Sequence, residues 1–500
     1  MRKPMAKKVL AATLAAAMTM SAAACGKGGD TSASAPASTD STSTETSKEE
    51  TSTEVSEEAP AEEEEVSEYT VLIDPATGAP YDLGGIEVVV RDWFTSPDRA
   101  EAKTDFEEAQ YAYQDWIQET YNFKIHGETI GDWGSVAQDF VDYVTAGGDD
   151  NNYVFTLHSG DATMLSAVDN GLVYDLSTLD CLDFSEAKFA NGVHKLYTID
   201  GGIYAMRAGW AEPRTGLYFN KRLLQEAGVD PESLYDMQAN DTWTWAAFEE
   251  ILEKVQRDTD NDGTIDIWGI GVNEGVMVSA AVFSNGGKYV GQDADGKYTY
   301  EFESPETLEA LEWVRDIFNK YDWNGPVDEE GNAAAWDYYQ NQFKTGGCAF
   351  CCDQQYCATP GNLFYETEDE LGFVMFPKGP KGSLIQTAQD NICIIPSCYD
   401  ADRAWKCAFA YSLYNEFVPG FEDYNPYVNT TATGNFDERA CKETVPLMSK
   451  NSTVELQSII PNLDMGEPFT WKFYPDMAPI SEILDGCRDM YKQYIEEANN

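Results

Sequence analysis

The chain has 500 residues and a formal net charge of -54, from 87 acidic and 33 basic residues. The electrostatic field of this negative charge disfavours binding of nucleic acid, anionic lipid and polyanionic ligands, so that neutral or cationic ligands remain. Only three histidines are present, at positions 126, 158 and 194, and no G-x-S-x-G or Walker-type run occurs. A catalytic histidine base or a zinc site is therefore poorly supported. A glycosidase uses a pair of carboxylates, but with 87 acidic residues such a pair cannot be recognised in the sequence. We do not expect an enzyme.

The N-terminus predicts export. Four basic residues among the first eight precede the apolar run VLAATLAAAMTMSAAA and then Cys25. This is the layout of a signal peptide over residues 1–24, and the run is too short for the roughly 20 apolar residues of a bilayer span. The stretch SAAACG resembles the lipobox of bacterial lipoproteins, with Ala22 in place of the usual Leu, which implies that Cys25 is acylated. The alternative is a plain secretory signal followed by an incidental cysteine.

Residues 25–68 predict a disordered tether. Positions 26–68 hold 13 acidic and 2 basic residues and are otherwise mainly Ser, Thr and Ala, with no aromatic residue. A segment of this composition buries too little apolar surface to offset its ordering entropy. It would hold a globular body away from a membrane surface.

The start of the body alternates strand and helix patterns. Residues 86–90 and 123–130 read as strands, and the intervening 100–123 has apolar and aromatic residues at helical spacing. Residues 135–148 then predict a helix and 151–161 a third strand. This β-α-β-α-β order predicts a mostly parallel sheet covered by helices.

Ligands of such sheets bind outside the carboxyl ends of the strands. The loops expected there contain Asp92, Trp93, Trp133 and the run His158–Asp161. These loops are the first candidates for a binding site.

The most specific sequence motifs lie in the middle of the chain. Residues 200–256 read DGGIYAMRAGWAEPRTGLYFNKRLLQEAGVDPESLYDMQANDTWTWAAFEEILEKVQ. They resemble the signature region of the solute-binding proteins of ABC importers, especially the large sugar-binding group. That family has a "dGkiYalP" hairpin, then "glyYNKdlfkeaGld", then a Trp at a helix start, and the counterparts here are Gly201–Met206, Gly216–Gly228 and Trp243–Phe248. The runs AGGDDNNYVFTLHSGDATMLSAVDNGLVYDL, FKTGGCAF, LGFVMFPKGPKGS and DRAWKCAFAYSLYN are similar to further family segments in the same order, so the resemblance covers most of residues 86–415.

The resemblance implies an α/β fold of the two-lobed, type II periplasmic-binding-protein class with hinge strands. Lobe one would comprise residues 69–210 plus 388–435, and lobe two 211–387 plus 436–500. The expected crossings between them are Arg207–Arg214, Thr387–Asn391 and the region 430–445. The solute would be trapped by closure of this hinge.

Candidate ligand contacts follow from the chemistry of a sugar. A pyranose stacks its C–H face on an aromatic ring, and its hydroxyls need amide or charged partners. The aromatic candidates in loops or at strand ends are Trp93, Trp133, Trp210, Trp245, Trp336 and Tyr427. The polar candidates are Asp92, Asp161, Glu212, Arg214, Asp353, Gln354 and Asn429. For each aromatic residue the alternative is core packing, because most Trp and Tyr side chains are buried.

The run DTDNDGTIDIWG, which begins at Asp258, has the spacing of an EF-hand-like calcium loop. The expected ligands are Asp258, Asp260, Asp262, Thr264 and Asp266. Position twelve is Gly269, where such loops carry a bidentate Glu, so another carboxylate would have to complete the shell. A structural calcium ion and a plain acidic turn both remain open, and no cofactor is required.

Ten cysteines follow Cys25, four of them in GGCAFCCDQQYC. Disulfides are usual in exported proteins, but this clustering favours thiols that act as small buried apolar groups. A thiolate metal site between Cys348 and Cys357 is the alternative, and no disulfide pairing is assigned.

The sequence thus predicts a monomeric, lipid-anchored binding component of an ABC importer at the outer face of the cell membrane. It would deliver a carbohydrate, an oligosaccharide, to permease subunits. A peptide or polyamine receptor on the same fold, a sensor domain that feeds a kinase, and a glycosidase are the alternatives.

Overall fold

Residues 86–157 form alternating strands and helices, as their pattern predicts. The computed structural model describes residues 69–95, 99–158, 162–323, 337–388, 391–473 and 478–499, all within one unit, Ser67–Asn500. The predicted signal peptide, the tether and Cys25, as well as Asp161 and Trp336, lie outside the described residues.

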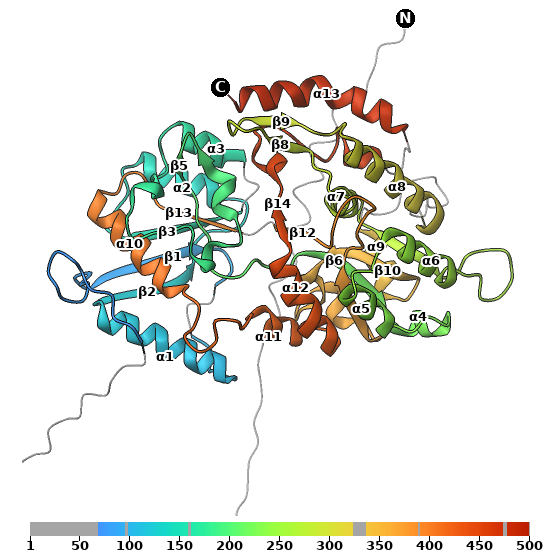
Figure 1. Ribbon diagram of the computed structural model, residues 1–500, viewed down its shortest axis with the longest axis horizontal. Coiled ribbons are helices and arrows are strands. Elements are labelled where there is room, and N and C mark those ends of the chain that lie inside the picture. The colour runs from blue at the N-terminus through green and yellow to red at the C-terminus, as the bar shows by residue number, and fades with distance from the viewer. Residues whose placement is uncertain are drawn as a thin grey trace, which may run out of the picture. The chain divides into compact units, whose positions relative to one another are not determined.

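The α-helices (Figure 1) are α1 (Asp105–Thr120), α2 (Val136–Thr145), α3 (Ala162–Asp169), α4 (Lys221–Glu226), α5 (Glu232–Ala239), α6 (Trp245–Val255), α7 (Glu274–Ser284), α8 (Pro305–Tyr321), α9 (Tyr338–Lys344), α10 (Ala401–Tyr414), α11 (Tyr427–Ala432), α12 (Val445–Lys450) and α13 (Ile480–Glu497). The strands are β1 (Ile86–Asp92), β2 (Phe123–Thr129), β3 (Asn152–Leu157), β4 (Thr198–Ile199), β5 (Gly202–Ile203), β6 (Thr215–Asn220), β7 (Trp268–Val272), β8 (Val290–Gln292), β9 (Tyr298–Tyr300), β10 (Cys348–Gln354), β11 (Leu371–Met375), β12 (Gln386–Ala388), β13 (Ile392–Ile394) and β14 (Ser452–Val454).

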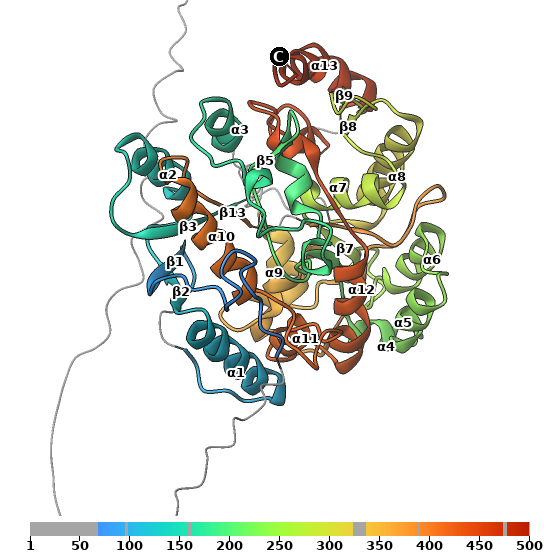
Figure 2. The ribbon, with the colours of Figure 1, turned by 60° about the vertical axis from the view of Figure 1, so that its left-hand side comes forward.

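The first sheet has the strand order β13-β3-β1-β2. Strand β1 runs parallel to β2 and to β3, whereas β13 joins β3 antiparallel. Helices α1 and α10 cover the same sheet, and Figure 2 shows α10 beside β1 and β3. The predicted βαβαβ unit is therefore confirmed, and a strand from far along the chain completes it.

Local chemistry sets the limits of these helices. Helix α1 begins at Asp105 because the side chain of Thr104 accepts a hydrogen bond from the backbone N–H of Glu107 at 3.2 Å. Its residues Phe106, Tyr113 and Ile117 are buried, which is the apolar face that the periodicity predicts.

The second sheet has the order β11-β6-β10-β7. Strand β6 is antiparallel to both neighbours, and β10 runs parallel to β7. Two side chains cap helices in this region: Asn220 accepts from the backbone N–H of Leu223 at the start of α4, and Thr244 accepts from that of Ala247 at the start of α6. Gly228, after α4, has a φ of +75°, as a helix-ending glycine requires.

Three segments that are distant in sequence meet at Gln386, which is 2% exposed. Its side-chain oxygen accepts from the backbone N–H of Arg214 at 2.7 Å, and its amide nitrogen donates to the carbonyls of Glu212 and Met448 at 3.0 and 3.1 Å. Strand β12, which begins with Gln386, also pairs in parallel with β14. Helix α11 packs on α12 and on a π-helical turn at Ala440–Thr444, which in turn contacts β11 of the second sheet.

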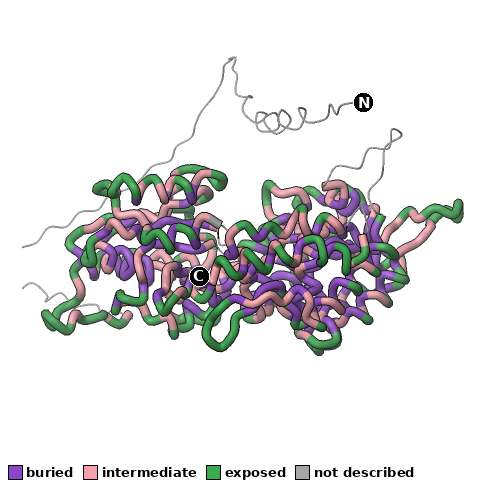
Figure 3. Tube along the Cα trace, turned by 90° about the horizontal axis from the view of Figure 1, so that it is seen from above, coloured by how far each residue is buried: buried purple, intermediate pink, exposed green. Residues whose placement is uncertain are grey.

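Two clusters of buried side chains hold these layers. One joins the face of the first sheet that carries Val88 and Ile125 to α1 and α10, and the other spans the opposite face of that sheet and the second sheet. Figure 3 shows the buried segments inside these layers and the exposed ones outside. None of the helices in the described ranges is long and apolar enough to cross a bilayer.

The cysteines contribute to this packing. Cys348, Cys351 and Cys352 in β10 are fully buried, and burial raises the pKa of each thiol well above its ordinary value. The ten cysteines of the described ranges are all free thiols.

Candidate functional site

A cavity of about 720 Å³ lies at the carboxyl ends of β3, β7 and β10, and we call it the central cavity. It is lined by Trp133, His158, Arg214, Asn273, Val276, Tyr339, Gln340, Asp353, Gln354, Tyr356, Cys357, Asn362, Leu363, Asn391 and Ser458. The first sheet contributes the residues that follow β2 and β3, and the second sheet contributes the ends of β7 and β10. Strands from both sheets thus direct their carboxyl ends at one space, where α/β proteins bind ligands.

Two exposed aromatic rings lie in the wall of this cavity. Trp133 is 60% exposed and Tyr356 is 45% exposed. Trp133 stacks on His158, with ring centroids 4.8 Å apart and an interplanar angle of 21°. One ring from each sheet can therefore present an apolar face to a ligand.

Asp353, at the end of β10, is the central acid of the cavity and is 3% exposed. Its carboxylate accepts hydrogen bonds from the hydroxyl of Tyr339 at 3.2 Å and from the backbone N–H of Gln354 at 2.8 Å. Asn273 donates in turn to the Tyr339 hydroxyl at 2.9 Å. Burial raises the pKa of the Asp353 carboxyl above its ordinary value, since removal from water disfavours the charged form.

Arg214 supplies the cationic side of the cavity. One of its terminal nitrogens pairs with Glu212 at 2.8 Å, while its Nε is buried without a hydrogen-bond partner in the described part of the chain. Its backbone N–H donates to Gln386, and its carbonyl accepts from the N–H of Gln355 at 2.8 Å. The guanidinium is thus carried on a fixed backbone and retains donor capacity.

The structure brings four of the predicted ligand residues together in the central cavity: Trp133, Arg214, Asp353 and Gln354. Glu212 adjoins them through its ion pair with Arg214.

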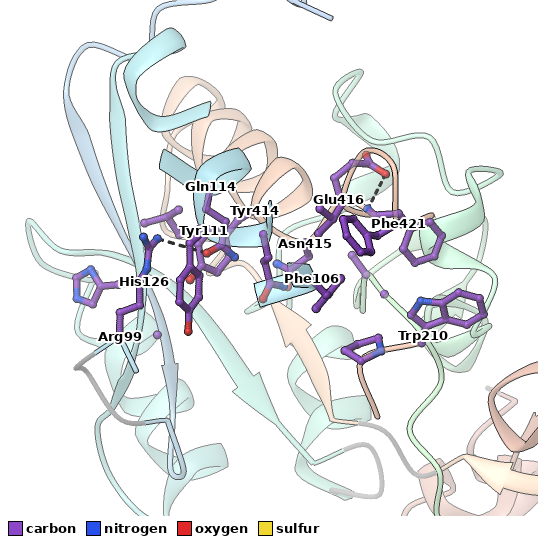
Figure 4. A pocket seen from close by; sticks show the side chains of 18 of the residues that line it. Arg99, Phe106, Tyr111, Gln114, His126, Trp210, Tyr414, Asn415, Glu416 and Phe421 are labelled. Atoms are coloured by element: carbon purple, nitrogen blue, oxygen red, sulfur yellow. Dashed lines mark hydrogen bonds between the residues drawn. The ribbon is translucent and has the colours of Figure 1, made fainter. Parts of the chain in front are cut away.

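Trp210 and Tyr427 line a different cavity, of about 640 Å³, which we call the lateral cavity (Figure 4). It is bounded by α1, by residues 124–127 of β2, and by the segments 207–210 and 414–427. Asn429, in α11, is half-buried and hydrogen-bonds through its side chain to Tyr424, which lines the lateral cavity.

The three remaining predicted residues that the structure describes lie in neither cavity wall. Asp92 is buried and its carboxylate accepts from the backbone N–H groups of Phe94 and Thr95 at 2.9 and 2.8 Å, so it shapes the loop after β1. Trp93 is half-buried and packs edge-on against His158. Trp245 is 5% exposed and stacks on Trp313, with centroids 4.1 Å apart and nearly parallel planes.

The residues of the central cavity that sequence reasoning did not select include Asn273, Tyr339 and Tyr356. Asn273 directly follows the buried strand β7, so its position after an apolar run was an available signal. Tyr356 lies two residues after Gln354 in the same loop. Tyr339 belongs to the buried face of α9, and nothing in the sequence separates it from a core tyrosine.

The acidic loop gathers three of its five predicted calcium ligands. Their carboxylate oxygens lie within 4.8 Å of one another, and they come from Asp258, Asp260 and Asp262. In the ranges that the structure describes, this is the one group of three or more His, Cys, Asp or Glu side chains close enough to share a metal ion. Asp266 instead accepts from the backbone N–H and the hydroxyl of Thr259 at 2.7 and 2.5 Å. The three carboxylates fit the oxygen preference of calcium, whereas Thr264 offers only backbone and hydroxyl oxygens and Gly269 offers no carboxylate.

Comparison with solved structures identifies the fold. The chain is similar to a cyclic alpha-maltosyl-1,6-maltose binding protein from Arthrobacter globiformis, with a TM-score of 0.58 and 16% identity over 83% of this chain and 100% of that one. It is also similar to the sugar-binding protein MalE from Xanthomonas citri (TM-score 0.54, 14% identity, 83% and 98% covered). A third is the GacH receptor of Streptomyces glaucescens (TM-score 0.51, 16% identity, 82% and 99% covered). These likenesses confirm the predicted α/β, type II periplasmic-binding-protein fold.

A search among curated proteins finds no match. The model of one protein family, described as bacterial extracellular solute-binding protein, matches residues 104–415, which is more than half of the chain. Members of this family bind solutes and are not enzymes. The chain therefore belongs to the bacterial extracellular solute-binding protein family.

Proposed function

We propose that this chain is the substrate-binding component of an ABC importer and that it captures a neutral oligosaccharide in the central cavity. The observation that carries the proposal is the pairing of exposed rings, Trp133 and Tyr356, with hydrogen-bonding groups of Arg214, Asn273 and Asp353 in one wall. Ring faces suit the C–H face of a pyranose, and the polar groups suit its hydroxyls. The structural relatives named above are a maltosyl-maltose binding protein, a sugar-binding protein and a receptor solved in complex with acarbose, and they support the same ligand class.

Capture would occur by closure of the two proposed lobes around the sugar. The buried Gln386 supports a hinge at this place, because it joins the backbone of residues 212–214 to that of Met448 and begins the β12–β14 pair. Ligand contacts with both sheets would favour the closed state. The closed protein would then be presented to permease subunits.

The anchor is proposed from the N-terminal sequence alone. Acylation of Cys25 would leave residues 26–68 as the link between the membrane and the folded unit. Mass spectrometry of the N-terminal peptide from membranes of the producing cells should find a diacylglyceryl group on Cys25. Recovery of an unmodified Cys25 would refute the anchor.

A ligand panel tests the solute. Neutral oligosaccharides, short peptides and polyamines are added to the purified chain, and the thermal midpoint is recorded. A sugar at about 100 times its Kd should stabilise the protein by about 2.7 kcal/mol. In the double variant W133A/Y356A the rise of the thermal midpoint with the sugar should be much smaller. The matched variant Trp471→Ala, which removes a ring that is 58% exposed and lines neither cavity, should retain it. Stabilisation by a peptide or an amine alone would reject the sugar in favour of those receptors.

Calcium is proposed only as a structural ion at Asp258, Asp260 and Asp262. The family requires no cofactor, so loss of the ion should affect the loop and not the binding of the solute. Calorimetry that detects no heat on addition of calcium would remove this proposal.

A further inference from the structure

The lateral cavity lies apart from the site assigned to the solute. It shares no lining residue with the central cavity, and its volume of about 640 Å³ is within the range of about 300–1,000 Å³ typical of ligand pockets. Figure 4 shows Arg99, Tyr111 and His126 at one end of it and Trp210 at the other. A molecule of disaccharide size would therefore touch several elements at once.

The charged groups in its wall are largely paired within the protein. Arg99 donates to Asp115 at 2.9 Å and lies over the ring of Tyr111, 4.6 Å from its centroid. Glu416 pairs with the buried Lys188 at 2.5 Å. Such a wall favours a ligand without net charge, because an ionic ligand would compete with these pairs.

Amide groups follow one face of α1 along the cavity. Gln110, Gln114 and Gln118 are spaced four residues apart and all line it. The side chain of Gln118 is already used, since it donates to the carbonyl of Gln114 and accepts from the N–H of Ile125 at 3.1 Å. In the described part of the chain the amide of Gln110 has no such partner, so it can bond a ligand.

The opposite end holds a second unused donor. Trp210 lines the cavity and its indole N–H is buried without a hydrogen-bond partner among the described residues. Its ring contacts that of Phe417, with centroids 5.3 Å apart. A hydroxyl of a ligand would satisfy the N–H that the protein leaves unpaired.

From these features we infer that the lateral cavity is a second binding site, for a neutral saccharide of one or two rings. Aromatic rings line it beside amide groups, which is the combination that recognises a polyhydroxylated ring. Two of its walls, residues 207–210 and 414–427, belong to or adjoin the proposed crossings between lobes. The site thus lies beside the hinge and not between the strand ends.

Calorimetry on the purified chain tests the inference, with D-glucose, maltose, cellobiose and trialanine as probes. The wild type should bind two equivalents of a saccharide with different affinities. The double variant Q110A/W210F should weaken one equivalent at least tenfold and leave the other unchanged. The variant W133A/Y356A should do the converse. Gln110→Ala alone is the second variant, because it alters a partly exposed side chain without a bond to lose and should not disturb folding.

The outcomes separate this inference from the proposed function. One equivalent that only W133A/Y356A abolishes would overturn the lateral site and leave the proposed function intact. One equivalent that only Q110A/W210F weakens would support the lateral site and count against the central one. Binding of trialanine in place of saccharide at the lateral site, or no saccharide binding at all, would overturn the inference.

Discussion

Arg214 gives the sharpest test of the central cavity. It is 17% exposed in its side chain, its only ion pair is with Glu212 at 2.8 Å, and its Nε is buried without a partner in the described ranges. A sugar oxygen that accepts a hydrogen bond from this guanidinium gains a charge-assisted bond. Arg214→Ala removes that bond and leaves Glu212, which is 27% exposed, to be solvated by water.

A hydrogen bond to a charged group contributes about 1.5–3 kcal/mol, so the substitution should raise the Kd about 10- to 150-fold. Calorimetry with the sugar found in the ligand panel measures the change. Arg214→Lys should fall between the two, because the ammonium group keeps the charge but not the planar fork.

The control is Arg488→Ala. Arg488 pairs with Glu303 and Asp485 at 2.6 Å each and lines neither cavity, so the change removes an arginine ion pair away from the ligand. Its Kd should equal that of the wild type. An affinity of Arg214→Ala that also stays within twofold of the wild type would refute the role of Arg214 as a clamp.

Three further predictions follow from the structure. Because burial raises the pKa of Asp353 above 3.8, the folded protein holds this proton more tightly than the unfolded chain does. Its contribution to stability is therefore largest at low pH and declines as pH rises through that raised value. The affinity for sugar should change in the opposite sense and fall on acidification, because protonation of the carboxylate removes a hydrogen-bond acceptor. Sugar titrations of Asp353→Asn at several pH values should show a weaker dependence of affinity on pH. Trp245→Ala should lower the free energy of unfolding by about 3–5 kcal/mol, because the stack on Trp313 is lost, and should leave sugar affinity unchanged. Urea unfolding measures the loss, with Trp471→Ala as the matched control. Weaker sugar binding by Trp245→Ala would return Trp245 to the ligand site. Chelation of calcium should lower the thermal midpoint of the wild type but not of Asp260→Asn, and equal shifts in both proteins would exclude the acidic loop as the origin.

The sequence was most informative where local patterns decide the structure. The order of strands and helices over residues 86–157 follows from periodicity, and the caps at Asn220 and Thr244 follow from side chains beside their own helices. Pairing between distant segments has no such local signal. Strand β13 joins β3 from more than 200 residues away, and only the family resemblance pointed to a chain that returns to its first sheet.

The lack of a local signal for long-range packing also affects the predicted site residues. Trp133 and Trp210 are both tryptophans of loops, and stacking chemistry selects both. The structure places Trp133 in the central cavity and Trp210 in the lateral cavity. Trp245 was selected for the same reason, but its partner Trp313 lies 68 positions along the chain and buries it. Residue type thus indicated the kind of contact, whereas the packing of distant elements decided where that contact is made.

Arg214 shows how residues without a sequence signal can position a predicted site residue. Its backbone is fixed on one side by Gln386 and on the other by Gln355. Gln386 is an ordinary glutamine in a short polar run, and its partners lie 172 and 62 residues away. Because these hydrogen bonds form on folding, the backbone of Arg214 is ordered before any ligand binds. Binding would then have to order only its side chain. The proposed clamp and the proposed hinge would therefore be held by one buried amide, so that closure would move the sheets while the arginine keeps its place at the junction.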